Sequence, residues 1–197
     1  MDTYSCYNKL AASEREGLDY RVRWRAGRSR YLLIAPHGGW IERGTEFLAD
    51  AVAADLHAFY AFSGLAPRCS RLHITSDNFD EPRALALAES AASVISIHGA
   101  RGAERCIYFG GLDMQLRARL RQTLENVGLP TRDEPSPSRQ GRGRTNICNR
   151  GRRKRGVQIE LPVGMRKALF DYEMSHDRWQ INAEGLRFVA AMRKVLG

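Results

Sequence analysis

The amino-acid sequence predicts a single α/β domain that spans residues 1–197. The apolar run Tyr31–Ile34 is typical of a buried strand, and it leads through a glycine-rich turn into a helical pattern. The stretch from Arg105 to Phe109 is likewise followed by glycines and a helical pattern. Strands that alternate with helices indicate a sheet covered by helices, and 197 residues suit one domain of ordinary size.

Apolar periodicity predicts the elements of the N-terminal half. Apolar residues alternate with arginines at 19–24, so one face of this strand is expected to be exposed to solvent, which suits an edge or antiparallel strand. His57 falls in a helical pattern and is interpreted as a structural histidine. His73 lies on the face of its strand opposite its apolar neighbours Leu72 and Ile74, which is compatible with a supporting role next to a functional site. In order, the elements are a helix at 9–15, strands at 19–24 and 31–34, a helix from Thr45 (its N-cap) to Phe59, a strand at 72–75 and a helix at 83–92.

The C-terminal half adds further strands and a long loop. The strand at 93–99 is rich in β-branched residues, and three leucines form one stripe of the helix that Asp113 caps. A loop as long as residues 131–155 is uncommon in a compact domain and is usually functional or disordered. In order, the elements are strands at 93–99 and 105–109, a helix at 113–127, the loop at 131–155, a strand at 156–162 and helices at 166–173 and 182–195.

Composition excludes several classes of protein. No apolar run approaches the roughly 20 residues that a membrane helix needs, so we expect no membrane association. The first residues lack a basic region followed by an apolar one, which predicts no signal peptide and synthesis in a cytoplasm, with release by cell lysis left open. The four cysteines form no CxxC pair, so zinc-finger and thioredoxin classes have no support, and reduced thiols are expected.

The formal charge of +9 favours a polyanionic partner, which can be nucleic acid or another anionic polymer. Eight of the basic residues lie between Arg139 and Arg155, where no acidic residue occurs. This run is either a solvated loop or a nucleic-acid-binding arm. Nucleic acid is disfavoured because the run has no aromatic residue to stack on bases. Metal content distinguishes the two classes, since a binding arm requires no metal.

A histidine and a glutamate on one loop are the first candidate metal ligands. His37 and Glu42 lie in the glycine-rich turn after Tyr31–Ile34, at the carboxyl end of a strand, where open α/β sheets bind ligands. Imidazole nitrogen and carboxylate oxygen are both zinc ligands. Taken alone, such a pair is more often a surface hydrogen bond.

Two further residues stand at equivalent strand ends. His98 ends the strand at 93–99, and Glu160 lies near the end of the strand at 156–162. Each has a plainer interpretation, as a hydrogen-bonded core histidine and as a strand-edge glutamate that reaches solvent. Together with His37 and Glu42, however, they predict a catalytic site, because two histidines and one glutamate leave a zinc position open. Glu160 is then the candidate to take a proton from water and pass it to a leaving amine, as amide hydrolysis requires.

Several motifs resemble the poly-γ-glutamate hydrolase family, and they arrive in the family's order over about residues 20–195. They are Ala-Pro-His-Gly-Gly-x-Ile-Glu-x-Gly-Thr at 35–45, Ser-Ile-His-Gly at 96–99, Gly-Gly-Leu-Asp at 110–113, Asn-Ile-Cys-Asn-Arg at 146–150 and Gly-Val-Gln-Ile-Glu-Leu at 156–161. This family comprises phage and bacterial zinc amidases related in fold to the carboxypeptidase A group. The resemblance implies an open mixed β-sheet with helices on both faces.

The resemblance also implies a division of roles. One Zn²⁺ would be held by His37, Glu42 and His98, and the catalytic carboxylate would be Glu160. A substrate carboxylate would be held by Arg150 with Asn149. If Arg150 does not have this role, Arg166 is the next candidate for it. A forked guanidinium matches a carboxylate bidentately, and poly-γ-glutamate carries one carboxylate per residue. We therefore expect a monomeric zinc-dependent hydrolase of poly-γ-glutamate. Another γ-glutamyl substrate, such as peptidoglycan peptides, stays open, as do the stereochemistry and the choice between endo and exo cleavage.

Overall fold

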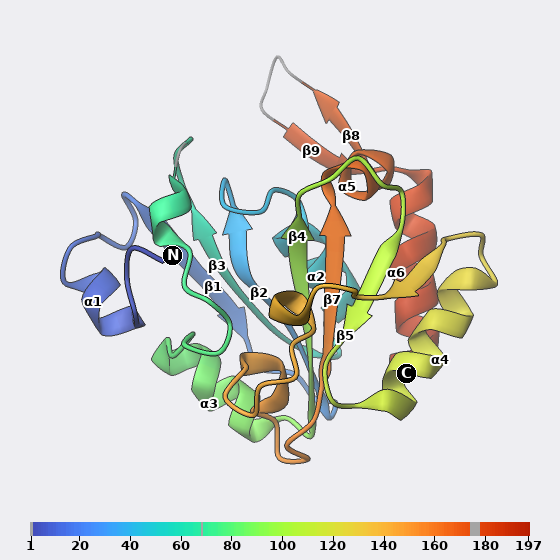
Figure 1. The fold of residues 1–197 in the computed structure, drawn as a ribbon, viewed down its shortest axis with the longest axis horizontal. Coiled ribbons are helices and arrows are strands. Elements are labelled where there is room, and N and C mark those ends of the chain that lie inside the picture. The colour runs from blue at the N-terminus through green and yellow to red at the C-terminus, as the bar shows by residue number, and fades with distance from the viewer. Residues whose placement is uncertain (1, 68, 174–177) are drawn as a thin grey trace.

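Seven strands form one mixed sheet in the computed structural model, which describes residues 2–67, 69–173 and 178–197. The strand order is β1-β3-β2-β4-β7-β5-β6. Strands β2, β3, β4 and β7 are mutually parallel, whereas β1 and β5 run antiparallel to their neighbours β3 and β7 (Figure 1). The bounds are β1 (Tyr20–Arg25), β2 (Tyr31–Gly39), β3 (Ala58–Gly64), β4 (Ser93–Ala100), β5 (Ile107–Gly110), β6 (Thr131–Asp133) and β7 (Val157–Pro162).

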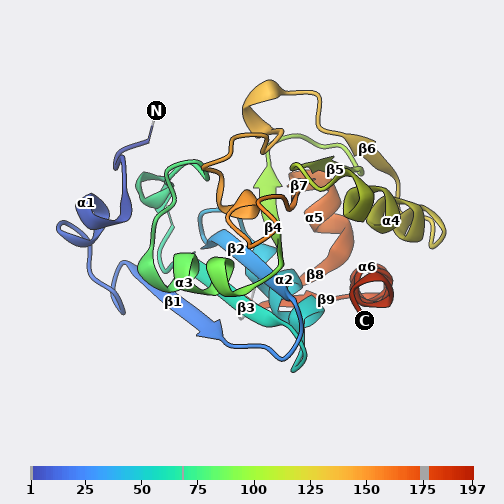
Figure 2. The ribbon, with the colours of Figure 1, turned by 90° about the horizontal axis from the view of Figure 1, so that it is seen from below.

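Helices cover both faces of this open sheet, as expected (Figure 2). Side chains alternate between the faces of a strand, so Leu33 and Ile95 enter the core beneath α2, α4, α5 and α6, while Leu32 and Val94 enter the core beneath α1 and α3. The bounds are α1 (Tyr7–Ala11), α2 (Thr45–Ala53), α3 (Pro82–Ser90), α4 (Met114–Glu125), α5 (Val163–Leu169) and α6 (Ala183–Leu196), with 3₁₀ turns η1 (Cys69–Leu72), η2 (Pro137–Arg139) and η3 (Ile147–Asn149) and a separate hairpin of β8 (Phe170–Glu173) and β9 (Arg178–Ile181). No helix in the described ranges is long and apolar enough to cross a membrane.

The helix expected from Thr45 to Phe59 is too long, and a strand within this region was missed. α2 ends at Ala53, Ala54 adopts a φ of +46°, and the chain turns into β3. β3 is buried along its whole length between β1 and β2, so its sequence lacks the alternation that reveals a half-exposed strand. The expected N-cap also shifts by one residue, because Gly44 caps α2.

Three other expectations were wrong in part. The strand expected at 72–75 is the turn η1 followed by loop, although Leu72 and Ile74 do enter one core, as their alternation with His73 predicted. The helix expected at 166–173 begins at Val163 and stops at Leu169, where β8 starts. The loop expected at 131–155 contains β6, η2 and η3. The edge position of the strand at 19–24 is confirmed, since β1 ends the sheet and runs antiparallel to β3.

Candidate metal centre

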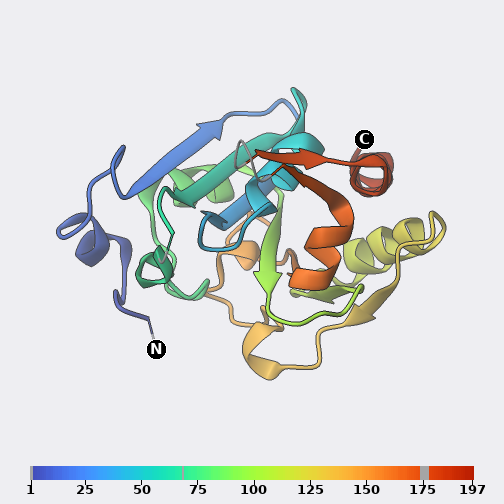
Figure 3. The ribbon, with the colours of Figure 1, turned by 90° about the horizontal axis from the view of Figure 1, so that it is seen from above.

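The crevice between β2 and β4 is the point at which the chain changes direction across the sheet. β2 continues through α2 to β3 on one side, while the chain after β4 continues to β5 on the other. Figure 3 looks onto the end of the sheet where β2, β4 and β7 finish. Ligands of open α/β sheets bind at such a switch point, outside the carboxyl ends of the strands. His37 comes from β2 and His98 from β4, so both histidines lie at this crevice.

A bulge in β2 sets the direction of His37. The register of β2 against β3 shifts between Ala35 and Gly38, and bulges of this kind re-aim side chains next to active sites. The following turn brings Glu42 back over the strand, because the Glu42 N–H donates to the His37 carbonyl at 2.8 Å. The buried Glu46 carboxylate accepts from the Gly39 N–H and holds the start of this turn.

Three donor groups converge at the crevice. The Nδ1 atoms of His37 and His98 lie 3.2 Å apart. Glu42 Oε1 lies 3.2 Å from His37 Nδ1, and Glu42 Oε2 lies 3.5 Å from His98 Nδ1. The Gly99 N–H donates to Glu42 Oε2 at 2.8 Å and fixes the carboxylate. Both imidazoles are buried, so these donors form a cluster shielded from solvent.

The other nitrogen of each imidazole is held by an oxygen. His37 Nε2 lies 2.8 Å from the Ile74 carbonyl, which can only accept, so His37 Nδ1 carries the lone pair in the neutral ring. His98 Nε2 lies 2.8 Å from Ser96 Oγ and 3.3 Å from Ser76 Oγ. Metal-binding histidines are oriented in the same way, with the second nitrogen bonded to an oxygen.

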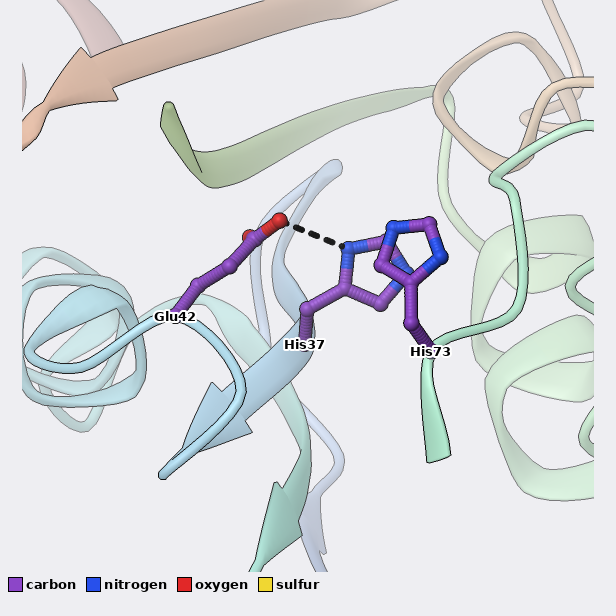
Figure 4. A group of neighbouring side chains, drawn as sticks. All are labelled: His37, Glu42 and His73. Atoms are coloured by element: carbon purple, nitrogen blue, oxygen red, sulfur yellow. Dashed lines mark ion pairs between the residues drawn. The ribbon is translucent and has the colours of Figure 1, made fainter. Parts of the chain in front are cut away.

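A third histidine, His73, lies beside this cluster. Its ring lies tilted against His37 with centroids 4.0 Å apart, and one of its nitrogens forms a second donor set with His37 and Glu42 (Figure 4). Its Nδ1 pairs with Asp2 Oδ1 at 2.8 Å. Because 36% of the His73 side chain is exposed, against 4% for His98, the set completed by His98 is the more enclosed one.

Glu160 lies next to His98 on the neighbouring strand. The two residues are register partners across β4 and β7, so their side chains share one face of the sheet. Glu160 Oε1 accepts from Gln158 Nε2 at 2.9 Å, and Gln158 Nε2 also donates to the Arg139 carbonyl at 2.8 Å. Gln158 therefore holds the Glu160 carboxyl in place.

Electrostatics distinguish the two carboxyl groups. Burial raises the pKa of Glu42, but the imidazoles of His37 and His98 outweigh burial and hold this pKa well below its usual range. Burial also raises the pKa of Glu160, to about 7, because the opposing charge of His98 offsets only part of it. Glu42 is thus ionised, and Glu160 can gain or lose a proton near neutrality.

Arg166 ties together the segments that carry these groups. Its Nε donates to the Leu161 carbonyl at 3.1 Å, Nη1 to the Arg43 carbonyl at 2.8 Å and Nη2 to the Ala100 carbonyl at 3.3 Å. Leu161 and Arg43 directly follow Glu160 and Glu42, and Ala100 lies two residues after His98. One guanidinium therefore contacts all three segments of the cluster.

The structure brings His37, Glu42, His98 and Glu160 into one cleft, but Asn149 and Arg150 do not line it. The Asn149 amide is buried and engaged by backbone groups, with Nδ2 2.8 Å from the carbonyls of Gly141 and Gly143. Arg150 precedes Gly151, which packs on the residues just before β4 begins, at the opposite end of that strand from His98. The substrate role expected for these two residues stays a prediction.

Sequence reasoning left several residues in and around the cleft without a role. Gln158 and Ser96 could have been found, because each lies two positions before a candidate residue and so shares its face. Arg139 was noted only as one residue of the basic run, without a role in the cleft. No sequence pattern connects Asp2 with His73, since their contact joins residues 71 positions apart. The structural role expected for His57 is confirmed: it is buried and bonded to Ser29, although it lies after α2 instead of within it.

A sequence profile described as poly-gamma-glutamate hydrolase matches residues 4–191. The chain belongs to the poly-γ-glutamate hydrolase family. Among curated relatives from Bacillus subtilis (strain 168), it is 36% identical to the SPbeta prophage-derived UPF0714 protein YoqZ over 172 residues, which are 86% of this chain and 62% of YoqZ. UPF0714 protein YmaC is 32% identical over 199 residues, covering 99% of this chain and 84% of YmaC. The chain therefore spans less than two thirds of YoqZ.

Solved structures of the poly-γ-glutamate hydrolase family share the fold. A bacteriophage poly-gamma-glutamate hydrolase superposes with a TM-score of 0.91 at 27% identity, covering 99% of this chain and 96% of that one. YndL in a form described as apo and zinc-free superposes with a TM-score of 0.92 at 34% identity, covering 100% and 98% of the two chains. The open mixed sheet expected from the motifs is thereby confirmed.

Proposed function

We propose that this protein is a zinc-dependent hydrolase that cleaves γ-glutamyl amide bonds of poly-γ-glutamate. The observation that carries the proposal is the convergence of two imidazole Nδ1 atoms and the Glu42 carboxylate beside Glu160 in one cleft. Family membership supports the choice of polymer, and the description of YndL as zinc-free supports the choice of metal.

The donor set fits one Zn²⁺. Two imidazole nitrogens and one carboxylate are the protein ligands of many catalytic zinc sites, and they leave a position for water or substrate. His37, Glu42 and His98 are the proposed ligands, and the oxygens bonded to the two Nε2 atoms hold the rings ready for that role. When bound, zinc supplies a Lewis acid that activates water and polarises the amide carbonyl.

Glu160 is the proposed proton carrier. It faces the same cleft, lies opposite His98 and is held by Gln158. A carboxylate in this position accepts the proton of the attacking water and delivers it to the leaving amine as the C–N bond breaks. A pKa raised to about 7 suits both transfers, because the group must accept and release a proton near neutrality.

Metal analysis of three variants tests the proposal. We expect the wild-type protein to bind one zinc per chain and His98→Ala to lose most of it, while His57→Gln, a change at a buried histidine outside the cleft, keeps it. Glu160→Gln should keep zinc but cleave the polymer at least about a hundredfold more slowly. Equal zinc in wild type and His98→Ala would contradict the ligand assignment. A fully active Glu160→Gln would contradict the mechanism, and cleavage of γ-glutamyl peptides from peptidoglycan in place of the polymer would change the substrate.

A further inference from the structure

The cleft continues from the candidate metal centre past Glu42 and Gly99 into a second branch. This branch has a volume of about 550 Å³ and shares Glu42, His73 and Gly99 with the first. Three arginines line it, namely Arg71, Arg101 and Arg166. The first branch has Arg139 and Asp77 on its walls instead.

The arginines around the cleft differ in whether a carboxylate already neutralises them. Arg139 pairs with Glu134 at 2.9 Å, and Arg71 pairs with Glu14 at 2.7 Å and with Asp19 at 3.2 Å. Arg166 bonds to three carbonyl oxygens, and no carboxylate in the described part of the chain lies within 4.0 Å of it. Among the described residues, Arg166 therefore lines the second branch without an ion-pair partner, although Asp2 and Glu42 also lie on the walls of this branch.

The position of Arg166 is rigid and close to the reacting groups. A Cβ atom added at Gly99 would lie 2.9 Å from both Arg166 Cζ and Glu42 Cβ, so the guanidinium and the Glu42 side chain both pack against Gly99, where a larger residue would not fit. A guanidinium has five N–H groups, of which these bonds engage one each on Nε, Nη1 and Nη2. Among the described residues, one N–H on Nη1 and one on Nη2 have no partner, and Arg166 lines this branch of the cleft.

We propose that Arg166 binds a substrate carboxylate beside the cleaved bond, so that the γ-glutamyl residue on its side of the metal centre is recognised by its free α-carboxylate. This inference rests on the proposed function. A planar fork held by three carbonyls loses little conformational freedom on binding. The same three bonds link the Arg166 guanidinium to the segments that carry Glu42, His98 and Glu160. Binding of a carboxylate by Arg166 is therefore coupled to the positions of the residues at the metal centre.

The test compares two γ-glutamyl oligomers of equal length, one with free α-carboxylates and one with α-carboxamides. For the zinc-loaded wild type, we expect kcat/KM to favour the free acid at least about tenfold. Arg166→Lys retains the charge but not the fork, and it should lower this preference to near unity while its zinc content stays unchanged. A purely structural role would lower the rates on both oligomers equally and leave the preference intact, which would overturn the inference. Arg187→Lys, at an exposed position of α6 outside both branches of the cleft, is the matched control and should keep the wild-type preference.

Calorimetry on zinc-free protein separates this inference from the proposed function. The free-acid oligomer should bind wild type more tightly than Arg166→Lys or Arg166→Gln, whether or not the protein turns it over. Equal binding to all three folded proteins would contradict the role of Arg166. Failure of the zinc-loaded wild type to cleave either oligomer would instead contradict the proposed function.

Discussion

Glu160 combines burial with a position opposite a histidine, and both affect its ionisation. Burial raises its pKa from 4.5 to about 7 in the folded protein, so the folded state keeps a proton that the unfolded chain releases. Since stability falls with pH wherever the folded state binds more protons, Glu160 reduces the free energy of unfolding progressively between about pH 4.5 and pH 7.

This sign predicts the behaviour of Glu160→Gln without zinc. Glutamine cannot ionise, so the variant should gain stability relative to wild type on going from about pH 5 to about pH 8, by at most about 3 kcal/mol. Urea unfolding of both proteins with a chelator present measures this difference. A stability difference that is the same at both pH values would show that Glu160 has an ordinary pKa.

Among the elements, α5 is placed by a close backbone contact. A Cβ atom at Gly164 would lie 2.0 Å from the Ala103 carbonyl oxygen, so the helix approaches the turn after β4 more closely than a side chain allows. This contact fixes the start of the helix that presents Arg166 to the cleft.

Gly164→Ala therefore sets two effects against each other. Alanine favours a helix interior over glycine by about 1 kcal/mol, but steric displacement of backbone costs typically about 1–3 kcal/mol. We expect net destabilisation, measured as a lower urea midpoint, together with a weaker kcat/KM preference for the free-acid oligomer because Arg166 moves. Gln115→Ala, at an exposed position of α4, is the control and should be nearly neutral. A more stable Gly164→Ala would show that the turn yields at little cost.

For the whole molecule, the charge of +9 predicts salt-sensitive action on an anionic polymer. Attraction between exposed charges is screened as the Debye length shortens, to about 10 Å at 0.1 M salt. The kcat/KM on poly-γ-glutamate should therefore fall when salt rises from about 0.05 M to about 0.5 M. The carboxamide oligomer is the control and should show a much weaker dependence. Equal salt dependence on both substrates would argue against a role for the net charge.

The local sequence was sufficient to predict the features that depend on strand periodicity and on the residues at strand ends. The glycine-rich turn after an apolar run located His37 and Glu42, and strand ends located His98 and Glu160, because strand periodicity and the placement of ligands at strand ends are local rules. Most helices and strands were expected within a few residues of their observed bounds. The exceptions were β3, which lacks alternation because both of its faces are buried, the strand expected at 72–75, the β8–β9 hairpin and the short elements within 131–155.

Contacts between distant residues required the folded chain. Strand order brings His37 and His98 together across 61 positions, and Arg166 reaches the Arg43 carbonyl across 123. The same packing leaves Asn149 buried against backbone groups and puts Arg150 near the opposite end of β4. A motif specifies which residue types are present. Which group a guanidinium or an amide bonds to depends instead on which segments lie side by side in the folded sheet. That order follows from burying both faces of the whole sheet, and no single stretch of sequence contains it.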